Sequence, residues 1–283
     1  MSHNAKLKVF IVVVALTFSV SVMASDAGNP ILSMNNEAGI AVTGTTMNYQ
    51  EHFTPAEIAN IKADDSETGW MPGFEAKYSL MGDYFNSLPS DMYFAVHYQR
   101  NSGNIAYKGS LQNGSIYDGT DSATTNRVIA RIGKGFQLSN AMMLTPYIAG
   151  GYQDWNRHML GPSGYTEDYS SGLIGAGAMF QYAATNRLVL TLNAEGLAMI
   201  GGGMTPHNVP GYGNTLGNTS FGTSGQEKIA ADVDYRISGP WHLYGGLSYT
   251  HFNYTGGALN FGASEPLSST NLFSMDAGIG YQF

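Results

Sequence analysis

The sequence predicts an all-β fold, a transmembrane antiparallel up-and-down β-barrel of ten strands. Two observations predict this fold: long segments in which apolar and polar residues alternate, and connections between them that are alternately short and long. A third feature, an export signal at the N-terminus, directs the chain out of the cytoplasm. Together they point to the bacterial outer membrane.

The alternation is clearest at the C-terminus, where apolar side chains occupy every second position of residues 273–283. A period of two belongs to a strand, and no amphipathic helix produces it. The same pattern recurs over residues 229–237 and 188–200 and, more loosely, over 92–98. These runs match the ~9 to 11 residues that a tilted strand needs to cross the hydrocarbon layer, whereas strands of soluble sandwiches are usually ~5 to 6 residues long. The length of the runs therefore favours a membrane barrel.

The connections support the same fold, because outer-membrane barrels alternate short periplasmic turns with longer external loops. Strands are expected at 38–51, 71–84, 91–101, 125–137, 142–155, 171–182, 187–202, 226–237, 241–255 and 270–283. Short turns are expected around residues 88–90, 138–140, 184–185 and 238–240, and long polar stretches at 52–70, 102–124, 156–170, 203–225 and 256–269. Eight or twelve strands remain alternatives, because the first strand is poorly patterned around Gly44 and Thr45 and residues 31–36 could form an additional strand.

The domain organisation begins with Lys6 and Lys8, which precede an uncharged apolar run over residues 9–22 and a small-residue pattern ending at Ala24. We therefore expect a cleaved signal peptide over 1–24, a periplasmic lead over 25–37 and the outer-membrane barrel over 38–283. The apolar run is shorter than the ~20 residues of a spanning helix.

Composition excludes several classes of function. Removal of Lys6 and Lys8 leaves 11 of the 13 basic residues against 21 acidic ones, so the net charge becomes −10, which argues against nucleic acid as a partner. The absence of cysteine excludes disulfides and cysteine-based catalysis or metal binding. Nothing in the sequence indicates a cofactor.

Aromatic residues fall where the two membrane interfaces are expected. The interface aromatics are Trp70 and Trp155 at external strand ends, and Trp241, Phe136, Tyr182 and Phe283 at periplasmic ends. Residues 278–283 resemble the terminal signal of outer-membrane barrels, and residues 145–152 are similar to their strands.

The chain after the signal peptide resembles the broad family of small outer-membrane β-barrels of Gram-negative bacteria, which includes OmpA-like, OmpX-like and opacity-type, porin-like proteins. The resemblance covers nearly every strand. It implies recognition by the barrel assembly machinery through the last strand, which ends in Phe283, and surroundings of outer-membrane lipid and lipopolysaccharide. It implies no particular activity.

Alternate residues of each strand face the lipid and the lumen, and the charged side chains of both signs fall on the lumen side. A network of ion pairs is expected there, because charges in a narrow interior are costly unless paired. Its candidate members are Glu75, Lys77, Arg127, Arg131, Glu195, Asp232, Asp234 and Arg236. The alternative is that these residues line a narrow selective pore.

No catalytic residues or metal ligands are predicted. Omptin-like catalysis would need an Asp-x-His pair, which the sequence lacks, and no histidine is followed two residues later by serine, the pattern of outer-membrane lipases and deacylases. Three acidic residues, Asp64, Asp65 and Glu67, could bind Ca²⁺, but a solvated loop is the simpler interpretation.

Two functional classes therefore compete. The first is a non-enzymatic surface structural or interaction protein that acts through its external loops, notably 203–225, towards a ligand that the sequence does not reveal. The alternative is a narrow, porin-like channel for small solutes, and an outer-membrane hydrolase of the omptin or lipase type is a remote third possibility.

Overall fold

The computed structural model describes residues 29–53, 64–83, 89–110, 115–161 and 164–283, and the predicted signal peptide lies outside them. Ten long strands form the wall: β1 (Glu37–His52), β2 (Ser66–Gly82), β3 (Met92–Ser110), β4 (Ile116–Lys134), β6 (Met142–Met159), β7 (Thr166–Ala183), β8 (Leu188–His207), β10 (Ser224–Ser238), β11 (Trp241–Tyr254) and β14 (Leu267–Gln282). Smaller elements are α1 (Pro30–Met34), β5 (Phe136–Ser139), β9 (Thr219–Ser220), β12 (Gly257–Ala258), η2 (Asn260–Gly262) and β13 (Ser264–Glu265).

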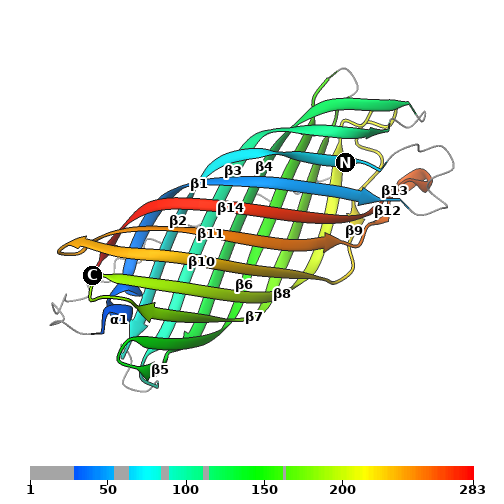
Figure 1. Ribbon diagram of the computed structural model, residues 1–283. Helices are drawn as coiled ribbons and strands as arrows, with labels where there is room; N and C mark the ends of the chain where they lie inside the picture. The colour runs from blue at the N-terminus through cyan, green and yellow to red at the C-terminus, as the bar shows by residue number, and fades with distance from the viewer. Residues whose placement is uncertain (1–28, 54–63, 84–88, 111–114, 162–163) are drawn as a thin grey trace, which may run out of the picture.

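The sheet closes on itself (Figure 1). Neighbouring long strands pair antiparallel, and the ring is completed because β14 pairs with both β11 and β1, from Glu37 opposite Gln282 to His52 opposite Leu267. The predicted ten-strand antiparallel barrel is therefore confirmed. Closure leaves no open edge, so the strands satisfy their backbone groups without water. The described residues include no helix long and apolar enough to cross a membrane.

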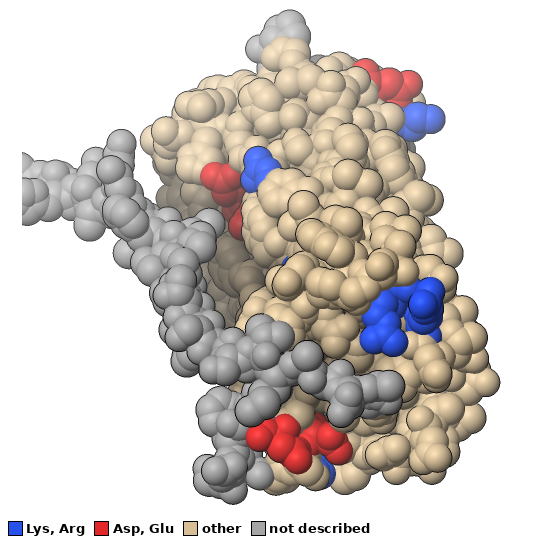
Figure 2. All heavy atoms as spheres, turned by 90° about the vertical axis from the view of Figure 1, so that its left-hand side faces the viewer, with Lys and Arg blue, Asp and Glu red and all other residues tan. Residues whose placement is uncertain are grey.

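The two ends of the barrel differ. At one end, here called the turn end, the strands are joined by residues 83–91, 135–141, 184–187 and 239–240. At the other, the loop end, they are joined by residues 53–65, 111–115, 160–165, 208–223 and 255–266. Figure 1 places α1, β5 and the C-terminus at the turn end and β9, β12 and β13 at the loop end. Seen from the side of the turn end, most of the visible surface is formed by uncharged residues, and Lys, Arg, Asp and Glu occupy only small patches (Figure 2). In an outer-membrane barrel these ends face the periplasm and the exterior.

The outward face of the wall changes character along the barrel axis, as β6 illustrates. From the turn end its outward residues are first apolar, with Ile148 and Tyr152 exposed, and then polar, with Asn156 and His158 exposed. The inward face also changes. Towards the turn end it carries the polar and charged groups that line a cavity, and towards the loop end it carries aromatic and methionine side chains together with buried charged residues such as Arg157 and Glu67. The apolar outer zone suits lipid, and the polar outer zone suits water.

The change of the outward face from apolar to polar explains why the strands are longer than the sequence predicts. Parts of the polar stretches expected to be loops at 52–70, 102–124, 156–170 and 203–225 are strand, so β3 continues to Ser110 and β8 to His207. The alternation continues there, but a polar outward face alternating with apolar inward residues no longer looks like a membrane strand. The wall thus extends beyond the apolar belt at the loop end.

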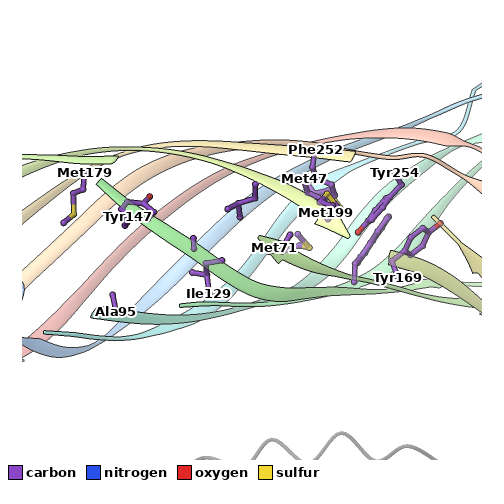
Figure 3. Close-up of a cluster of buried hydrophobic side chains, with 14 of the residues drawn as sticks. Met47, Met71, Ala95, Ile129, Tyr147, Tyr169, Met179, Met199, Phe252 and Tyr254 are labelled. Atoms are coloured by element: carbon purple, nitrogen blue, oxygen red, sulfur yellow. The ribbon is translucent and has the colours of Figure 1, made fainter. Parts of the chain in front are cut away.

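An aromatic core lies in the interior near the loop end (Figure 3), beside a cavity of about 60 Å³ that Trp155, Phe252 and Tyr254 help to line. It consists of Tyr49, Trp155, Tyr169, Phe221, Phe252 and Tyr254, packed with methionines such as Met47, Met71 and Met199. Trp155 lies between Tyr49 and Tyr169, with both ring centroids 4.9 Å from its own. Packing of this kind resembles the centre of a soluble protein more than the lining of a channel.

A short helix, α1, lies at the turn end. Asn29 caps it by accepting a hydrogen bond from the Ile31 amide at 2.9 Å, and the Ile31 side chain is fully buried. Asn35 then donates to the Gln181 side chain on β7 at 2.7 Å. These contacts fix the segment before β1 across the turn end of the interior.

Most of the predicted interface aromatics face outward. Trp70, Trp241, Phe136 and Tyr182 are exposed, and the Phe283 ring stacks on that of Tyr78 at 5.3 Å. Trp155 does not face the interface: it is 3% exposed and belongs to the aromatic core. Residues separated by an even number of positions lie on the same face of a strand. Trp155 is such a residue relative to Tyr147, and both side chains therefore face inward.

Candidate functional site

A polar cavity of about 140 Å³ occupies the interior between α1 and the middle of the barrel. Its lining includes most of the charged residues predicted to face the lumen: Glu75, Lys77, Arg127, Arg131, Asp232 and Asp234, together with His97, Lys228 and Asp276. Met34 and Asn35, at the end of α1, also line it. We call this cavity the charged chamber, and its volume accommodates several water molecules.

Two arginines of the charged chamber share one carboxylate. Arg127 donates to Glu195 Oε1 and Arg131 to Glu195 Oε2, both at 2.8 Å, and Glu195 is buried. Arg131 also stacks over the Tyr147 ring, with 5.2 Å from its central carbon to the ring centroid. Charge-assisted hydrogen bonds to both oxygens hold Glu195 in one orientation.

The other predicted members of the network are placed differently. Lys77 pairs with Glu37, and Asp234 Oδ1 lies 2.9 Å from His242 Nδ1. Arg236 is not among the chamber residues and donates instead to the Asn186 carbonyl at the turn end. Among the described residues, no ion pair within 4.0 Å joins Glu75 or Asp232 to a partner. In place of the expected single network there is one group of three residues, formed by Arg127, Arg131 and Glu195, and separate pairs elsewhere.

Glycine makes room for the Tyr147 side chain, which packs against Arg131 of the charged chamber. A Cβ atom on Gly177 would collide with the Tyr147 hydroxyl, and one on Gly133 would lie 2.8 Å from Tyr147 Cβ. Tyr147 uses this space to donate to Asn193 Oδ1 at 2.6 Å. The glycines of these two strands therefore accommodate an aromatic side chain.

A second charged group, the Arg157 cluster, lies beside the aromatic core. The Arg157 guanidinium lies 2.9 Å from Glu51 and 2.7 Å from Glu167, pairs with Glu67, and lies 3.7 Å from Asp121. All five side chains are buried. Four carboxylates against one guanidinium leave a formal surplus of three negative charges, which is tolerable in a buried site only when some carboxyl groups are protonated.

Glu265, from β13, joins this cluster through an aromatic side chain. The Tyr169 hydroxyl donates to Glu265 Oε1 at 2.6 Å. Burial, followed by repulsion from Glu167 and Glu51, raises the pKa of Glu265 well above its usual value. The shift favours the protonated form of this carboxyl group.

The Arg157 cluster does not follow from the sequence pattern. The pattern places Glu67 in a solvated loop, whereas it is fully buried on β2, and it places Arg157 in a polar external stretch. The alternation along β6 could have identified Arg157 as an inward-facing residue. It lies two residues after Trp155 and four after Gln153, and all three side chains are buried on the inward face.

The loop end carries an ordered platform formed by residues 208–218 and 255–266. The Asn260 amide donates to the Leu216 carbonyl, and the Asn260 side chain to the Thr215 carbonyl, each at 2.9 Å. The rings of Tyr212 and Phe261 lie 5.9 Å apart, and Phe261 is 72% exposed. We call Tyr212 and Phe261 the exposed aromatic pair.

The loop end also bears a histidine and carboxylate contact. His207 Nε2 lies 3.1 Å from Asp168 Oδ2, with 39% and 52% of the two side chains exposed. Asp168 also accepts a hydrogen bond from Asn156 on the neighbouring strand at 2.6 Å. The pair is on the outward wall, away from the polar interior.

No protein-family model matches the chain, and no curated protein matches it in sequence. Among solved structures, the barrel is similar to the outer membrane protease OmpT from Escherichia coli, with a TM-score of 0.56 at 10% identity over 88% of this chain and 97% of that one. The chain has the fold of a small bacterial outer-membrane β-barrel. Weaker similarities include the Pseudomonas putida toluene transporter TodX (TM-score 0.36, 13% identity, 90% and 92% coverage) and Neisserial surface protein A (0.31, 12%, 87% and 97%). At these identities the similarities concern the fold alone.

Proposed function

We propose that this barrel is a non-enzymatic surface protein of the outer membrane that binds a partner outside the cell through its loop end. The observation that carries the proposal is the exposed aromatic pair on an ordered platform, at the end of a barrel whose interior holds the aromatic core and the Arg157 cluster. A rigid aromatic surface suits binding, because its side chains lose little conformational freedom on contact.

The interior favours this proposal over transport. The aromatic core and the Arg157 cluster occupy the lumen towards the loop end, and α1 lies across the turn end of the charged chamber. A solute would have to displace packed rings as well as buried ion pairs. The charged chamber is therefore better explained as hydrated structural interior than as part of a continuous path.

The platform has buried apolar residues and hydrogen bonds of its own. Within it Val209 and Leu216 are buried, whereas Tyr212 and Phe261 are exposed. Phe261 has a φ of 60°, a left-handed conformation that is costly for a residue with a bulky side chain. Retention of an exposed ring at the cost of backbone strain is typical of functional positions.

The test is binding by whole cells that display the barrel. The double substitution Tyr212→Ser and Phe261→Ser should reduce adhesion to host-derived or bacterial surface material at least tenfold compared with the wild type, at equal surface amounts. Ile116→Ser is the matched control, because Ile116 also lies at the loop end and is likewise 72% exposed. Equal loss with the control, or none with the double variant, would contradict the proposal.

A narrow channel is the second candidate, and the charged chamber is the observation that favours it. Purified barrel in a planar bilayer should give no steady unitary conductance if the first proposal holds. Steady conductance that changes with Asp232→Asn would instead support the channel, since Asp232 lines the chamber.

A further inference from the structure

We propose that the turn end of the barrel contains a zinc site formed by Glu37, Asp234 and His242. One ligand atom from each of these residues lies within 4.8 Å of the others. An imidazole nitrogen and two carboxylate oxygens form a donor set that Zn²⁺ accepts, with water as the fourth ligand. The residues come from β1, β10 and β11, so the barrel fold brings together positions that are far apart in the sequence.

Glu37 provides the observation that points to a ligand. The residue is 2% exposed, and its two oxygens have different environments: Oε1 pairs with Lys77, whereas Oε2 is buried without a hydrogen-bond partner among the described residues. A Cβ atom on Gly280 would collide with Oε2 and lie 3.7 Å from His242 Cβ. The glycine therefore leaves room for this oxygen beside His242. A buried carboxylate oxygen without a partner is costly, and a cation would satisfy it.

His242 has the surroundings of a metal ligand. The side chain is fully buried, with Nδ1 2.9 Å from Asp234 Oδ1 and Nε2 3.3 Å from Gln282 Oε1. A hydrogen on Nε2, donated to Gln282, leaves the Nδ1 lone pair directed towards the carboxylates. Metal-binding histidines usually donate their other N–H to a carbonyl or carboxylate in this way. The competing arrangement is a charged imidazolium paired with Asp234, with no metal.

The position of Lys77 is compatible with a bound cation. Its ammonium group contacts the Oε1 side of Glu37 and lies 3.4 Å from the centroid of the Tyr244 ring. The ring holds the ammonium in place, so Glu37 can bridge Lys77 and the metal through different oxygens. With Lys77 positive and the two carboxylates negative, the group without a metal has a formal charge of −1 when His242 is neutral, which favours a divalent cation.

The location gives the site a structural consequence. Glu37 is opposite Gln282 in the pairing of β1 with β14, and His242 is opposite Gly280 in the pairing of β11 with β14. The metal and its supporting Gln282 would therefore connect four strands across the seam at which the barrel closes. Bound zinc should stabilise the closed ring.

The experiment uses full-length processed protein without a histidine tag, purified from outer membranes in detergent and treated with a chelator. Equilibrium dialysis followed by elemental analysis should show one Zn²⁺ per chain, and zinc should raise the unfolding temperature. His242→Gln should weaken binding at least 100-fold and Glu37→Gln at least tenfold. His207→Gln removes a histidine that contacts a carboxylate at the loop end, and it should leave zinc binding unchanged.

X-ray absorption of the zinc-loaded wild type provides a measurement that does not depend on variants. It should show nitrogen and oxygen ligands at about 2.0 to 2.2 Å, including one imidazole. Failure of folded wild type to take up zinc would overturn the proposal and favour the imidazolium pair. Uptake that survives His242→Gln, or a zinc spectrum without imidazole, would also overturn it.

Discussion

Replacement of Arg157 by methionine should destabilise the barrel strongly at neutral pH. The substitution keeps an unbranched side chain of similar length but removes the cation that four buried carboxylates face. Hydrogen bonds to charged groups contribute about 1.5 to 3 kcal/mol each, and removal of one partner from a buried ion pair costs about 3 to 5 kcal/mol. Because these contacts share one guanidinium, they do not add, and we expect a loss of about 3 to 5 kcal/mol in the free energy of unfolding.

The pH dependence identifies the cause of this loss. Without Arg157, the carboxylates must take up further protons, and protonation of a carboxyl group of ordinary pKa costs about 3.7 kcal/mol at pH 7 but about 1 kcal/mol at pH 5. The difference between wild type and Arg157→Met should therefore shrink to about 1 to 2 kcal/mol at pH 5. A loss caused by poorer packing would not change in this way.

Denaturant unfolding in lipid vesicles or detergent, followed by tryptophan fluorescence, measures this difference. Trp155 is a local reporter, because its ring centroid lies 5.8 Å from the central carbon of the Arg157 guanidinium. Arg236→Met is the control, since Arg236 donates to a backbone carbonyl at the turn end, and it should change stability by less than about 0.5 kcal/mol. Equal stability of wild type and Arg157→Met at pH 7, or a loss of undiminished size at pH 5, would refute the reasoning.

Two further predictions concern single side chains. Gly177→Val should lower the free energy of unfolding by about 1 to 3 kcal/mol, because the added side chain displaces Tyr147. Gly196→Ala on the adjacent strand, where an added Cβ atom meets no atom within 4 Å, should lower it by less than about 1 kcal/mol. Equal losses in the same unfolding assay would exclude the steric explanation. Glu265→Gln should have little effect in acidic solution, where Glu265 is protonated, because glutamine still accepts from Tyr169. The pKa of Glu265 is higher in the folded state than the value of about 4.3 in the unfolded state, so the folded wild type loses stability as the pH rises from the unfolded pKa through the folded one. Glutamine does not ionise, and Glu265→Gln should therefore become more stable than wild type in alkaline solution. Parallel pH profiles of stability for the two proteins would contradict this assignment.

The sequence carries enough information to predict the barrel because lipid imposes a strict pattern. Where the outside of a strand faces hydrocarbon, every second residue must be apolar, as in Ile229 and Val233 or Met275 and Ile279. The pattern specifies both the strands and their parity. It therefore predicted that Lys77, Arg127 and Asp232 face inward, as they do in the structure.

The pattern gave little guidance where water covers the wall. Beyond Tyr152 the outward residues of β6 are polar, and the inward residues include Trp155 and Arg157. A search for apolar outward faces therefore ended the strand early and placed Trp155 at an interface. Pairing could not be predicted either, because which charges meet depends on the register of distant strands, as when Arg157 on β6 meets Glu51 on β1.

The interior of the barrel within the apolar belt differs from the interior beyond the belt, and this difference bears on function. Within the apolar belt, lipid surrounds the wall, and the interior is polar around the charged chamber, which has room for water. Beyond the belt, water surrounds the wall, and the hydrophobic effect drives aromatic side chains inward, where they form the aromatic core. A wall extension stabilised by its own core needs no lipid, so it can hold the platform rigidly above the membrane. The aromatic core that supports the platform also occupies the lumen. Because one feature has both effects, we favour surface binding over transport.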